Sequence, residues 1–340
     1  MSDCSVVILN YNGKDTIIQL LESVIAQTEV PKEILVLDNC SDDGTDQAAE
    51  KWCSGKPNCE YHQFDSNIGF ARAMNWGIAH SSGEFVCLLN ADIFLSENYL
   101  QACTAQMKLD SSVGMVCGVL YRLVDGQKTL VIDSLGVALN KSRYHDDIGA
   151  GTIVEAPIIT VLYPFGIGGC APVYSRKMLL DISKDEPPFF ELFESYYEDV
   201  DLAWRARKMG WKAVCTGKTQ AWHVREGSLK GKKLKAIARN RNHRNRIWLM
   251  VLNERPSILL RQFFFWFPLQ AFFILKVFMQ PGLLLAYAEM VKKIPQILSI
   301  RKMRFKKLNK IPQMEEMNWF SENKNAYFRR ILRVFSKKMN

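Results

Sequence analysis

The sequence predicts an α/β fold built on a doubly wound, mostly parallel sheet and followed by a helical C-terminal tail. Three observations predict it. Strand-like apolar runs alternate with helical patterns through residues 1–95, polar residues stand where several of these runs end, and the charge of the chain changes sign near residue 225. With 340 residues, 48% of them hydrophobic, the chain can bury a sizeable core and is long for a single domain.

The N-terminal part alternates apolar runs with amphipathic segments. Strands are expected at residues 5–9, 33–38, 60–64 and 84–89. The segments between them have the apolar spacing of helices that pack on a sheet. They are residues 14–27, 42–53 and 71–81. Repeated β-α-β units of this kind are typical of a right-handed, Rossmann-like sheet flanked by helices.

Polar residues follow three of the four predicted strands. Asn10 and Asn12 come after the first, Asp38 ends the second, and Asn90 and Asp92 follow the fourth. In open parallel sheets, ligands bind beyond the carboxyl ends of the strands, so these residues predict a ligand crevice. The sequence has no GxGxxG or GxxxxGK[ST] motif, so the phosphates of a bound nucleotide would need another counter-charge. A divalent cation held by Asp92 is one candidate.

Two further features are ambiguous when each is taken alone. Residues 189–211, FFELFESYYEDVDLAWRARKMGW, carry several acids where a helix begins, and acids in a first helical turn are favourable without any catalytic role. Glu198 and Asp199 are adjacent, so on a helix they point to different faces. His223 follows an apolar stretch, and a lone histidine is more often structural than a ligand.

The tail differs from the rest of the chain in charge. Residues 225–340 carry 26 of the 44 Lys and Arg residues and 6 of the 35 Asp and Glu residues, a net charge of +20, which leaves −11 for residues 1–224. The uncharged stretch 262–275, QFFFWFPLQAFFIL, is shorter than the ~20 residues of a spanning helix. Basic runs at 231–246 and 301–310 flank it, which favours helices lying on an anionic membrane surface. A spanning or re-entrant hairpin and a soluble helical packing domain are the alternatives.

Nucleic acid is the other partner that basic charge could bind. The neighbouring hydrophobic helices favour lipid, and no nucleic-acid-binding motif is visible, so no nucleic-acid partner is expected. The nine cysteines include no CxxC pair, which fits a reducing compartment without a disulfide framework. The N-terminus, MSDCSVVILNYN, has no signal-peptide pattern. We therefore expect a cytoplasmic protein, peripheral or monotopic at the inner face of the cell membrane.

Seven segments together carry a resemblance to a known family. They are SVVILNYNGK (5–14), ILVLDNCSDDGT (34–45), SNIGFARAMNWGI (66–78), LLNADI (88–93), GIGGCAPVYSR (166–176), YEDVDLAWRARKMGW (197–211) and AWHVREGS (221–228). The sequence resembles inverting glycosyltransferases of family 2, in the branch of bacterial rhamnosyltransferases that build surface polysaccharides of the cell envelope. The resemblance implies a GT-A fold, a nucleotide-diphosphate sugar donor and a metal ion, Mn²⁺ or Mg²⁺.

The resemblance also implies roles for single residues. Asp92 and His223 match metal-ligand positions, and Asn90 stands where the family's DxD motif has its first acid. Asp199 matches the catalytic base. The nucleotide side comprises Asn10, Asn12, Asp38, Asn67, Gly69, Arg72 and Asn75, of which Asp38 matches the acid that contacts the pyrimidine or ribose. The acceptor side comprises Gly168, Gly169, Glu198 and Arg205.

These expectations define one function. A catalytic domain at 1–228, with a nucleotide-sugar half at about 1–95 and an acceptor half at about 96–228, precedes a basic, hydrophobic tail at 229–340. The enzyme is expected to move a sugar from a UDP- or dTDP-sugar, such as dTDP-rhamnose, to a hydroxyl of a glycan or lipid-linked saccharide. A nucleotidyltransferase of similar fold and a catalytically silent binding subunit are the alternatives.

Overall fold

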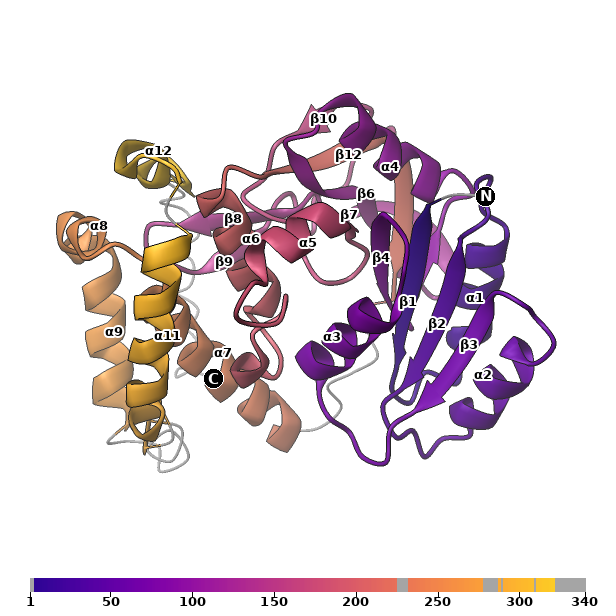
Figure 1. The fold of residues 1–340 in the computed structure, drawn as a ribbon, viewed down its shortest axis with the longest axis horizontal. Helices are drawn as coiled ribbons and strands as arrows, with labels where there is room; N and C mark the ends of the chain where they lie inside the picture. The colour runs from indigo at the N-terminus through magenta and orange to yellow at the C-terminus, as the bar shows by residue number, and fades with distance from the viewer. Residues whose placement is uncertain (1–2, 225–231, 278–286, 289, 309, 322–340) are drawn as a thin grey trace.

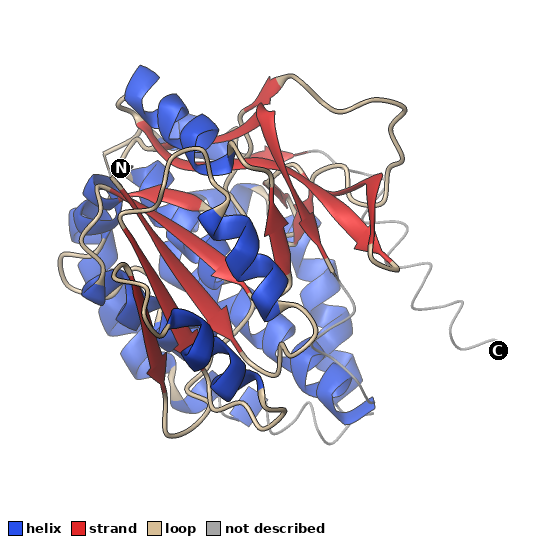
Figure 2. Cartoon of the chain, turned by 90° about the vertical axis from the view of Figure 1, so that its right-hand side faces the viewer, coloured by secondary structure: helices blue, strands red, loops and turns tan. Residues whose placement is uncertain are grey.

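The structure is a computed structural model that describes residues 3–224, 232–277, 287–288, 290–308 and 310–321. A ten-stranded sheet with helices on its faces occupies one part of the molecule, and helices from the end of the chain gather at the other (Figure 1, Figure 2). A smaller, three-stranded sheet has the order β13-β8-β9, so it joins the last described residues to the middle of the chain.

The first four strands form the parallel part of the sheet, in the order β4-β1-β2-β3. They are β1 (Cys4–Asn10), β2 (Glu33–Asp38), β3 (Cys59–Gln63) and β4 (Phe85–Asn90). The crossover helices are α1 (Ile17–Ile25), α2 (Thr45–Cys53) and α3 (Phe70–His80). All seven predicted elements are therefore confirmed. Almost every residue of β1 is buried, because α1 and α3 cover opposite faces of a strand made of apolar side chains.

The second half of the sheet mixes parallel and antiparallel pairs. Its strands are β5 (Ile93–Leu95), β6 (Val113–Val124), β7 (Gln127–Ser134), β10 (Val161–Leu162), β11 (Val173–Ser175) and β12 (Lys212–His223). β12 is parallel to β6, whereas β11 is antiparallel to both β4 and β6. The prediction of a mostly parallel sheet is thus correct for β1–β4 and wrong for the sheet as a whole.

The antiparallel pairs have local causes that periodicity alone does not reveal. β6 and β7 form a hairpin whose turn is Asp125–Gly126, both with positive φ. An Asp-Gly turn of this kind matches the twist of a two-stranded hairpin and needs no crossover helix. β8 (Val137–Asn140) and β9 (His145–Asp147) pair antiparallel in the smaller sheet. The remaining helices of this half are α4 (Tyr99–Leu109), α5 (Arg176–Ile182), the 3₁₀ turn η1 (Glu191–Phe193) and α6 (Glu198–Lys208).

The described part of the tail is helical. It contains α7 (Lys232–Asn253), α8 (Pro256–Arg261), α9 (Phe263–Val277), α11 (Ile294–Lys307), α12 (Gln313–Met317) and the short strand β13 (Phe320–Ser321). α7 packs against both α6 and α11. Trp248 and Leu252 of α7 belong to the same buried apolar cluster as Trp204 of α6. The tail therefore shares a core with the part of the chain that carries the sheet.

The predictions for the tail have separate outcomes. Among the described residues, no helix is both long enough and apolar enough to cross a membrane. Residues 225–231, where the predicted domain boundary falls, lie outside the described residues, as do 278–286 of the low-charge stretch and 322–340 of the basic tail. The division at residue 228 and the membrane contact remain predictions.

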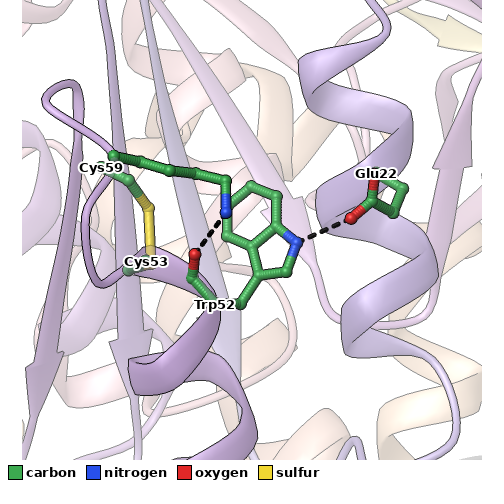
Figure 3. Close-up of a disulfide and its surroundings, with 5 residues drawn as sticks. Glu22, Trp52, Cys53 and Cys59 are labelled. Atoms are coloured by element: carbon green, nitrogen blue, oxygen red, sulfur yellow. Dashed lines mark hydrogen bonds between the residues drawn. A yellow bond between two sulfur atoms is a disulfide. The ribbon is translucent and has the colours of Figure 1, made fainter.

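One disulfide contradicts the expectation of none. Cys53, at the end of α2, and Cys59, at the start of β3, are joined across the α2–β3 turn (Figure 3). The spacing is not CxxC, but the turn brings the two Cα atoms to 5.2 Å. Trp52 beside this turn donates a hydrogen bond of 2.8 Å to Glu22 of α1, so the same corner is also tied to the neighbouring helix (Figure 3). The other seven cysteines are free thiols.

Candidate active site

A cavity of about 370 Å³ opens beyond the carboxyl end of β4. Its walls come from both halves of the sheet, from the 166–171 turn and from the beginning of α6. Its polar and small lining residues include Asn90, Asp92, Asp133, Ser134, His145, Asp147, Gly168, Gly169, Tyr196, Asp199 and His223. Six of the residues predicted from the sequence therefore lie together in this cavity, although the first and the last of them are more than 130 positions apart in the chain.

β-sheet pairing places Asp92 beside His223. Asp92 lies between β4 and β5, and β5 pairs antiparallel with β12 so that Ile93 stands opposite His223. The Asp92 Oδ2 and His223 Nε2 atoms are 3.3 Å apart, and the Val224 amide donates to the Asp92 carbonyl. The opposite ring nitrogen, Nδ1, lies 2.8 Å from a carboxylate oxygen of Asp133.

Asp133 fixes the orientation of the His223 ring. It is the penultimate residue of β7, its side chain is 1% exposed, and its second oxygen lies 3.3 Å from Nε of Arg122. Burial of His223 disfavours the imidazolium, but the hydrogen bonds to Asp133 and Asp92 outweigh it and raise the pKa of His223 to about 9. The ring therefore presents Nε2 toward Asp92 in a fixed geometry.

This arrangement fits a divalent cation that also binds a diphosphate. In the described part of the chain, no group of three His, Cys, Asp or Glu side chains is gathered as a complete metal site. Asp92 and His223 offer one carboxylate oxygen and one imidazole nitrogen on a common cavity wall, and phosphate oxygens can complete the ligand set. A histidine whose second nitrogen bonds a buried carboxylate is a common support for a metal ligand.

Asp199 enters the cavity from the first turn of α6. Its Oδ2 accepts a hydrogen bond of 2.9 Å from the Gly169 amide, and its Oδ1 accepts one of 2.8 Å from the Val200 amide. Burial raises the pKa of Asp199 above its ordinary value, although His145 and the two amides oppose this effect. A more basic carboxylate at a cavity wall is suited to accepting a proton.

Glu198 and Asp199 have different surroundings, as adjacency on a helix predicts. Glu198 is buried and is not a cavity-lining residue. Its Oε2 atom has no hydrogen-bond partner within the described part of the chain. Burial, together with the nearby Asp199 charge, raises the pKa of Glu198 well above its usual range. Only Asp199 of this pair reaches the cavity.

The predicted nucleotide-side residues after β1 and β2 form one hydrogen-bonded cluster. Asn10 Nδ2 donates to Asp38 Oδ2 at 2.6 Å and to the Ser41 hydroxyl at 3.1 Å. The Asn12 amide donates to the same Ser41 oxygen. Asp38 is fully buried and also accepts two hydrogen bonds from Ser41. The structure therefore brings these residues together, but the Asp38 carboxylate already accepts hydrogen bonds from Asn10 and Ser41.

The segment before and within α3 is connected to the acceptor half. Asn67 Oδ1 accepts a hydrogen bond from the Gly69 amide, and Gly69 has a φ of +84°, which its lack of a Cβ permits. Arg72 forms an exposed ion pair of 3.3 Å with Glu191. Asn75 is buried and exchanges two hydrogen bonds with the Phe189 backbone, so its amide holds the acceptor half in place.

Arg205 is not brought to the cavity. We predict it on the acceptor side, but its side chain is fully buried and pairs with Asp201 at 2.9 Å. Its remaining hydrogen bonds go to backbone carbonyls of residues 182–188. Arg205 follows Asp201 by one helical turn, so it lies on the face of α6 that points away from the cavity.

Three Asp or His residues of the cavity were not predicted from the sequence. They are Asp133, His145 and Asp147. Asp133 has a signal that could have found it, since LVIDS (130–134) is an apolar run ending in a carboxylate, as is LLNAD (88–92). His145 and Asp147 lie on the short strand β9, whose polar sequence has no strand pattern of its own.

Comparisons with known proteins show a similarity to glycosyltransferases. Residues 5–148 match the profile of Glycosyl transferase family 2. The succinoglycan biosynthesis protein ExoO of Rhizobium meliloti (strain 1021) is 33% identical over 238 residues, which cover 67% of this chain and 62% of that protein. The chain thus spans less than two thirds of that relative's length.

Two solved structures share the fold. The first is GalNAc-T7 with UDP, GalNAc and Mn²⁺, with a TM-score of 0.56 at 15% identity, and the match covers 73% of this chain and 48% of that chain. The second is the mannosyltransferase PcManGT of Pyrobaculum calidifontis with GDP-Man and Mn²⁺. It has a TM-score of 0.50 at 18% identity, and the match covers 89% of this chain and 74% of that chain. The mixed sheet flanked by helices is therefore GT-A-like.

Proposed function

We propose that this protein is an inverting glycosyltransferase that moves a sugar from a nucleotide-diphosphate donor to a hydroxyl of a glycan or lipid-linked saccharide. One observation carries the proposal. A single cavity holds a supported carboxylate–imidazole pair, Asp92 and His223, and a separate carboxylate, Asp199, whose pKa is raised. Transfer from a sugar diphosphate needs a charge-stabilising site for the leaving group and a base for the attacking hydroxyl.

Each group then has a distinct task. Asp92 and His223 would hold a divalent cation, Mn²⁺ or Mg²⁺, which when bound supplies positive charge to the diphosphate leaving group. Asp133 keeps the His223 ring in place. Asp199 accepts the proton of the acceptor hydroxyl as the glycosidic bond forms. With Asp199 as a base and no carboxylate assigned as a nucleophile, the proposed reaction is a single displacement, which inverts the anomeric configuration.

The donor is proposed to be a UDP- or dTDP-sugar. The basis is the resemblance of Asp38 to an acid that contacts a pyrimidine or ribose, and dTDP-rhamnose follows only from the resemblance to rhamnosyltransferases. In the structure Asp38 is buried beneath Asn10 and Ser41, so such a contact requires these side chains to rearrange. The two structural neighbours were crystallised with UDP and with GDP-Man, so the fold alone does not select the base.

A peripheral contact with an anionic membrane is proposed for the tail. Large apolar side chains of α8 and α9 are exposed, with Leu260 at 74%, Phe264 at 84% and Phe265 at 47%. The Lys141 ammonium lies 4.9 Å from the Phe265 ring centroid, and Arg261 is exposed beside Leu260. Exposed aromatics with adjacent cations are typical of segments that lie at a lipid interface. Attachment at the cytoplasmic face would place the cavity near lipid-linked acceptors.

The function can be tested by screening nucleotide sugars for binding and for donor hydrolysis, with and without Mn²⁺ or Mg²⁺. We expect one UDP- or dTDP-sugar to release its nucleoside diphosphate only with metal, and Asp92→Ala to reduce this release by about 10³-fold while leaving the circular dichroism spectrum unchanged. Full turnover in excess EDTA would contradict the metal role. Release of pyrophosphate would indicate a nucleotidyltransferase, and binding without turnover of any donor or acceptor would indicate a silent subunit.

A further inference from the structure

The segment that leads into α6 has an unusual backbone. Glu194, Tyr196 and Tyr197 all have positive φ values, of +61°, +71° and +73°. Side chains with a Cβ rarely adopt this region, so three such residues within four positions need external contacts to hold them. Tyr197 is the residue before the first turn of α6, and Asp199 follows two positions later. The shape of this segment therefore sets where Asp199 lies.

Asn245 of α7 supplies those contacts. Its side chain is fully buried, and its Nδ2 amide donates to three backbone carbonyl groups of the segment. The distances are 2.8 Å to Phe193, 2.9 Å to Ser195 and 2.8 Å to Tyr196. An amide has two hydrogens, so these bonds are partly shared. A single side chain thus holds the backbone on both sides of Glu194 and at Tyr196.

Neighbouring residues of α7 strengthen this attachment. Arg241 forms an ion pair of 2.5 Å with Glu194, and Arg244 lies 3.7 Å from the same carboxylate. Positions 241, 244 and 245 fall on one face of the helix, because residues three and four apart are neighbours. On the other side of the segment, the Ala71 amide of α3 donates to the Glu194 carbonyl. The segment is held between α7 and α3.

We propose that Asn245 is a positioning residue for the transfer reaction, acting through the strained 193–197 backbone on Asp199 and Tyr196. Asn245 does not line the cavity, whereas Tyr196 and Asp199 both do. Without the amide, the backbone can relax toward negative φ, which would turn the Tyr196 side chain and shift the start of α6. The bond of 2.9 Å between the Gly169 amide and Asp199 would then be lost. This inference rests on the proposed role of Asp199 as the base.

A double-mutant cycle in the full-length protein tests the proposal. We expect Asn245→Ala to lower kcat by roughly 10- to 100-fold, because small displacements of a catalytic group are costly in rate, and to leave the Kd for the donor within about threefold. In the Asp199→Asn background the same substitution should lower the residual rate by less than about threefold, since the group it positions is already disabled.

Asn253→Ala is the matched control. Asn253 is a buried asparagine of the same helix, and it donates to Asp201 Oδ1 at 2.7 Å and to the Leu249 carbonyl without touching residues 193–197. We expect it to lower the melting temperature at least as much as Asn245→Ala while changing kcat by less than about threefold. An equal loss of kcat in both variants would show a general effect of damaging α7 and would overturn the proposal.

The remaining outcomes separate this inference from the proposed function. If Asp199→Asn leaves turnover intact, the base assignment fails, whatever Asn245→Ala does. If Asp199→Asn lowers turnover and Asn245→Ala has the same effect in both backgrounds, or none, the positioning role fails. Should Asn245→Ala not fold, Asn245→Ser, which keeps one donor on the same Cβ, is used in its place. A kcat for it equal to that of the unaltered protein would contradict the proposal.

Discussion

Two faces of α6 carry aspartates in opposite electrostatic situations. Asp199 faces the cavity, and burial raises its pKa even though His145 and two backbone amides oppose this effect. Asp201 is also buried, but Arg304 and Arg205 outweigh burial and lower its pKa. Two residues along a helix correspond to a rotation of about 200°, so the two carboxylates point to nearly opposite sides.

The comparison shows how one helix can serve both chemistry and assembly. Asp201 binds Arg304 of α11 at 2.6 Å, and Arg304 also binds Glu186 at 2.7 Å. Nearby, Arg143 pairs with Glu254 where both side chains are fully buried. On this side of α6, charges are neutralised by partners from the tail. On the cavity side, the raised pKa of Asp199 provides a carboxylate that can accept a proton in a reaction.

The largest effect is expected at the cavity face. Asp199→Asn should lower kcat by about 10²- to 10⁴-fold with little change in donor binding, because a base acts mainly in the transition state. Glu198→Gln should have a smaller effect, since Glu198 does not reach the cavity. Initial rates and donor titrations measure both. The reverse order of effects would show that the base is Glu198.

The same assignment predicts the acid limb of the pH profile. The base works only when deprotonated, so kcat should fall as pH decreases through the raised pKa of Asp199. Because burial is the first cause of that shift, the limb should lie above the ordinary value of 3.8 for an aspartate. Asp199→Asn should flatten the limb, and an unchanged profile in this variant would assign the limb to another group.

The next largest effect is expected at the tail face, and there it concerns stability. Arg304→Met removes one partner of a buried ion pair and should lower the free energy of unfolding by about 3–5 kcal/mol. Lys307→Ala is the control, because its ion pair with Asp185 is largely exposed and should be worth less than about 1 kcal/mol. Denaturant unfolding compares the two. Similar losses in both would mean that burial of the Arg304 pair adds nothing.

The tail face also predicts a pH dependence of stability. The pKa of Asp201 is lower in the folded protein than its ordinary value, so its contribution is present at neutral pH and is lost as pH falls through the folded pKa. The difference in stability between the unaltered protein and Arg304→Met should therefore narrow below about pH 4. A constant difference down to that range would contradict the pairing.

A smaller effect is expected from the support of His223. Asp133→Asn keeps the shape of the side chain but weakens the hold on the ring, and it should raise the Mn²⁺ concentration needed for half-maximal activity by about 10- to 100-fold. Asp110→Asn alters an exposed aspartate that pairs with Lys212, and as the control it should leave the Mn²⁺ concentration for half-maximal activity unchanged. Equal Mn²⁺ requirements in the two variants would exclude this role for Asp133.

The two faces of α6 also differ in how far the sequence could predict them. Asp92 and Asp199 could be found because each lies in a short motif beside a predictable element, and parallel strands bring their ends together. Asp133 shows the same local signal but lies outside the motifs that carry the resemblance. The predicted nucleotide-side role of Asp38 depended on an open carboxylate, and only the structure shows it engaged by Asn10 and Ser41.

The tail face could not be predicted, because its partners are far apart in the chain. Arg304 stands in the basic run RKMRFKKLNK, which by itself indicates a solvent- or lipid-facing surface. Its partners Asp201 and Glu186 are 103 and 118 positions away. No local pattern distinguishes the buried Arg304 from the exposed Lys302 and Lys306 of the same helix. The net charge of the tail therefore includes basic residues, such as Arg304, that are buried in ion pairs and cannot contact a membrane.

The smallest expected effect concerns the part of the tail that is left exposed. Phe264 of α9 is 84% exposed, and burying such a side chain in lipid contributes about 1.5–3 kcal/mol. Phe264→Asp should therefore weaken sedimentation with anionic vesicles by roughly tenfold or more. Leu109→Asp is the matched control, because Leu109 is 77% exposed on α4, a helix that packs on β6 and β12 and lies well away from α9 (Figure 1). It should leave vesicle binding unchanged.

Salt then separates the two forces that would hold the tail to a membrane. Cations add ~1 kcal/mol each near anionic lipid, and salt screens this attraction, whereas burial of apolar side chains is not screened. We expect high salt to weaken vesicle binding without abolishing it, and detergent to release the protein. Complete release by salt alone would leave no role for Phe264, and a protein that never sediments with the vesicles would show that the exposed face of α8 and α9 meets something other than lipid.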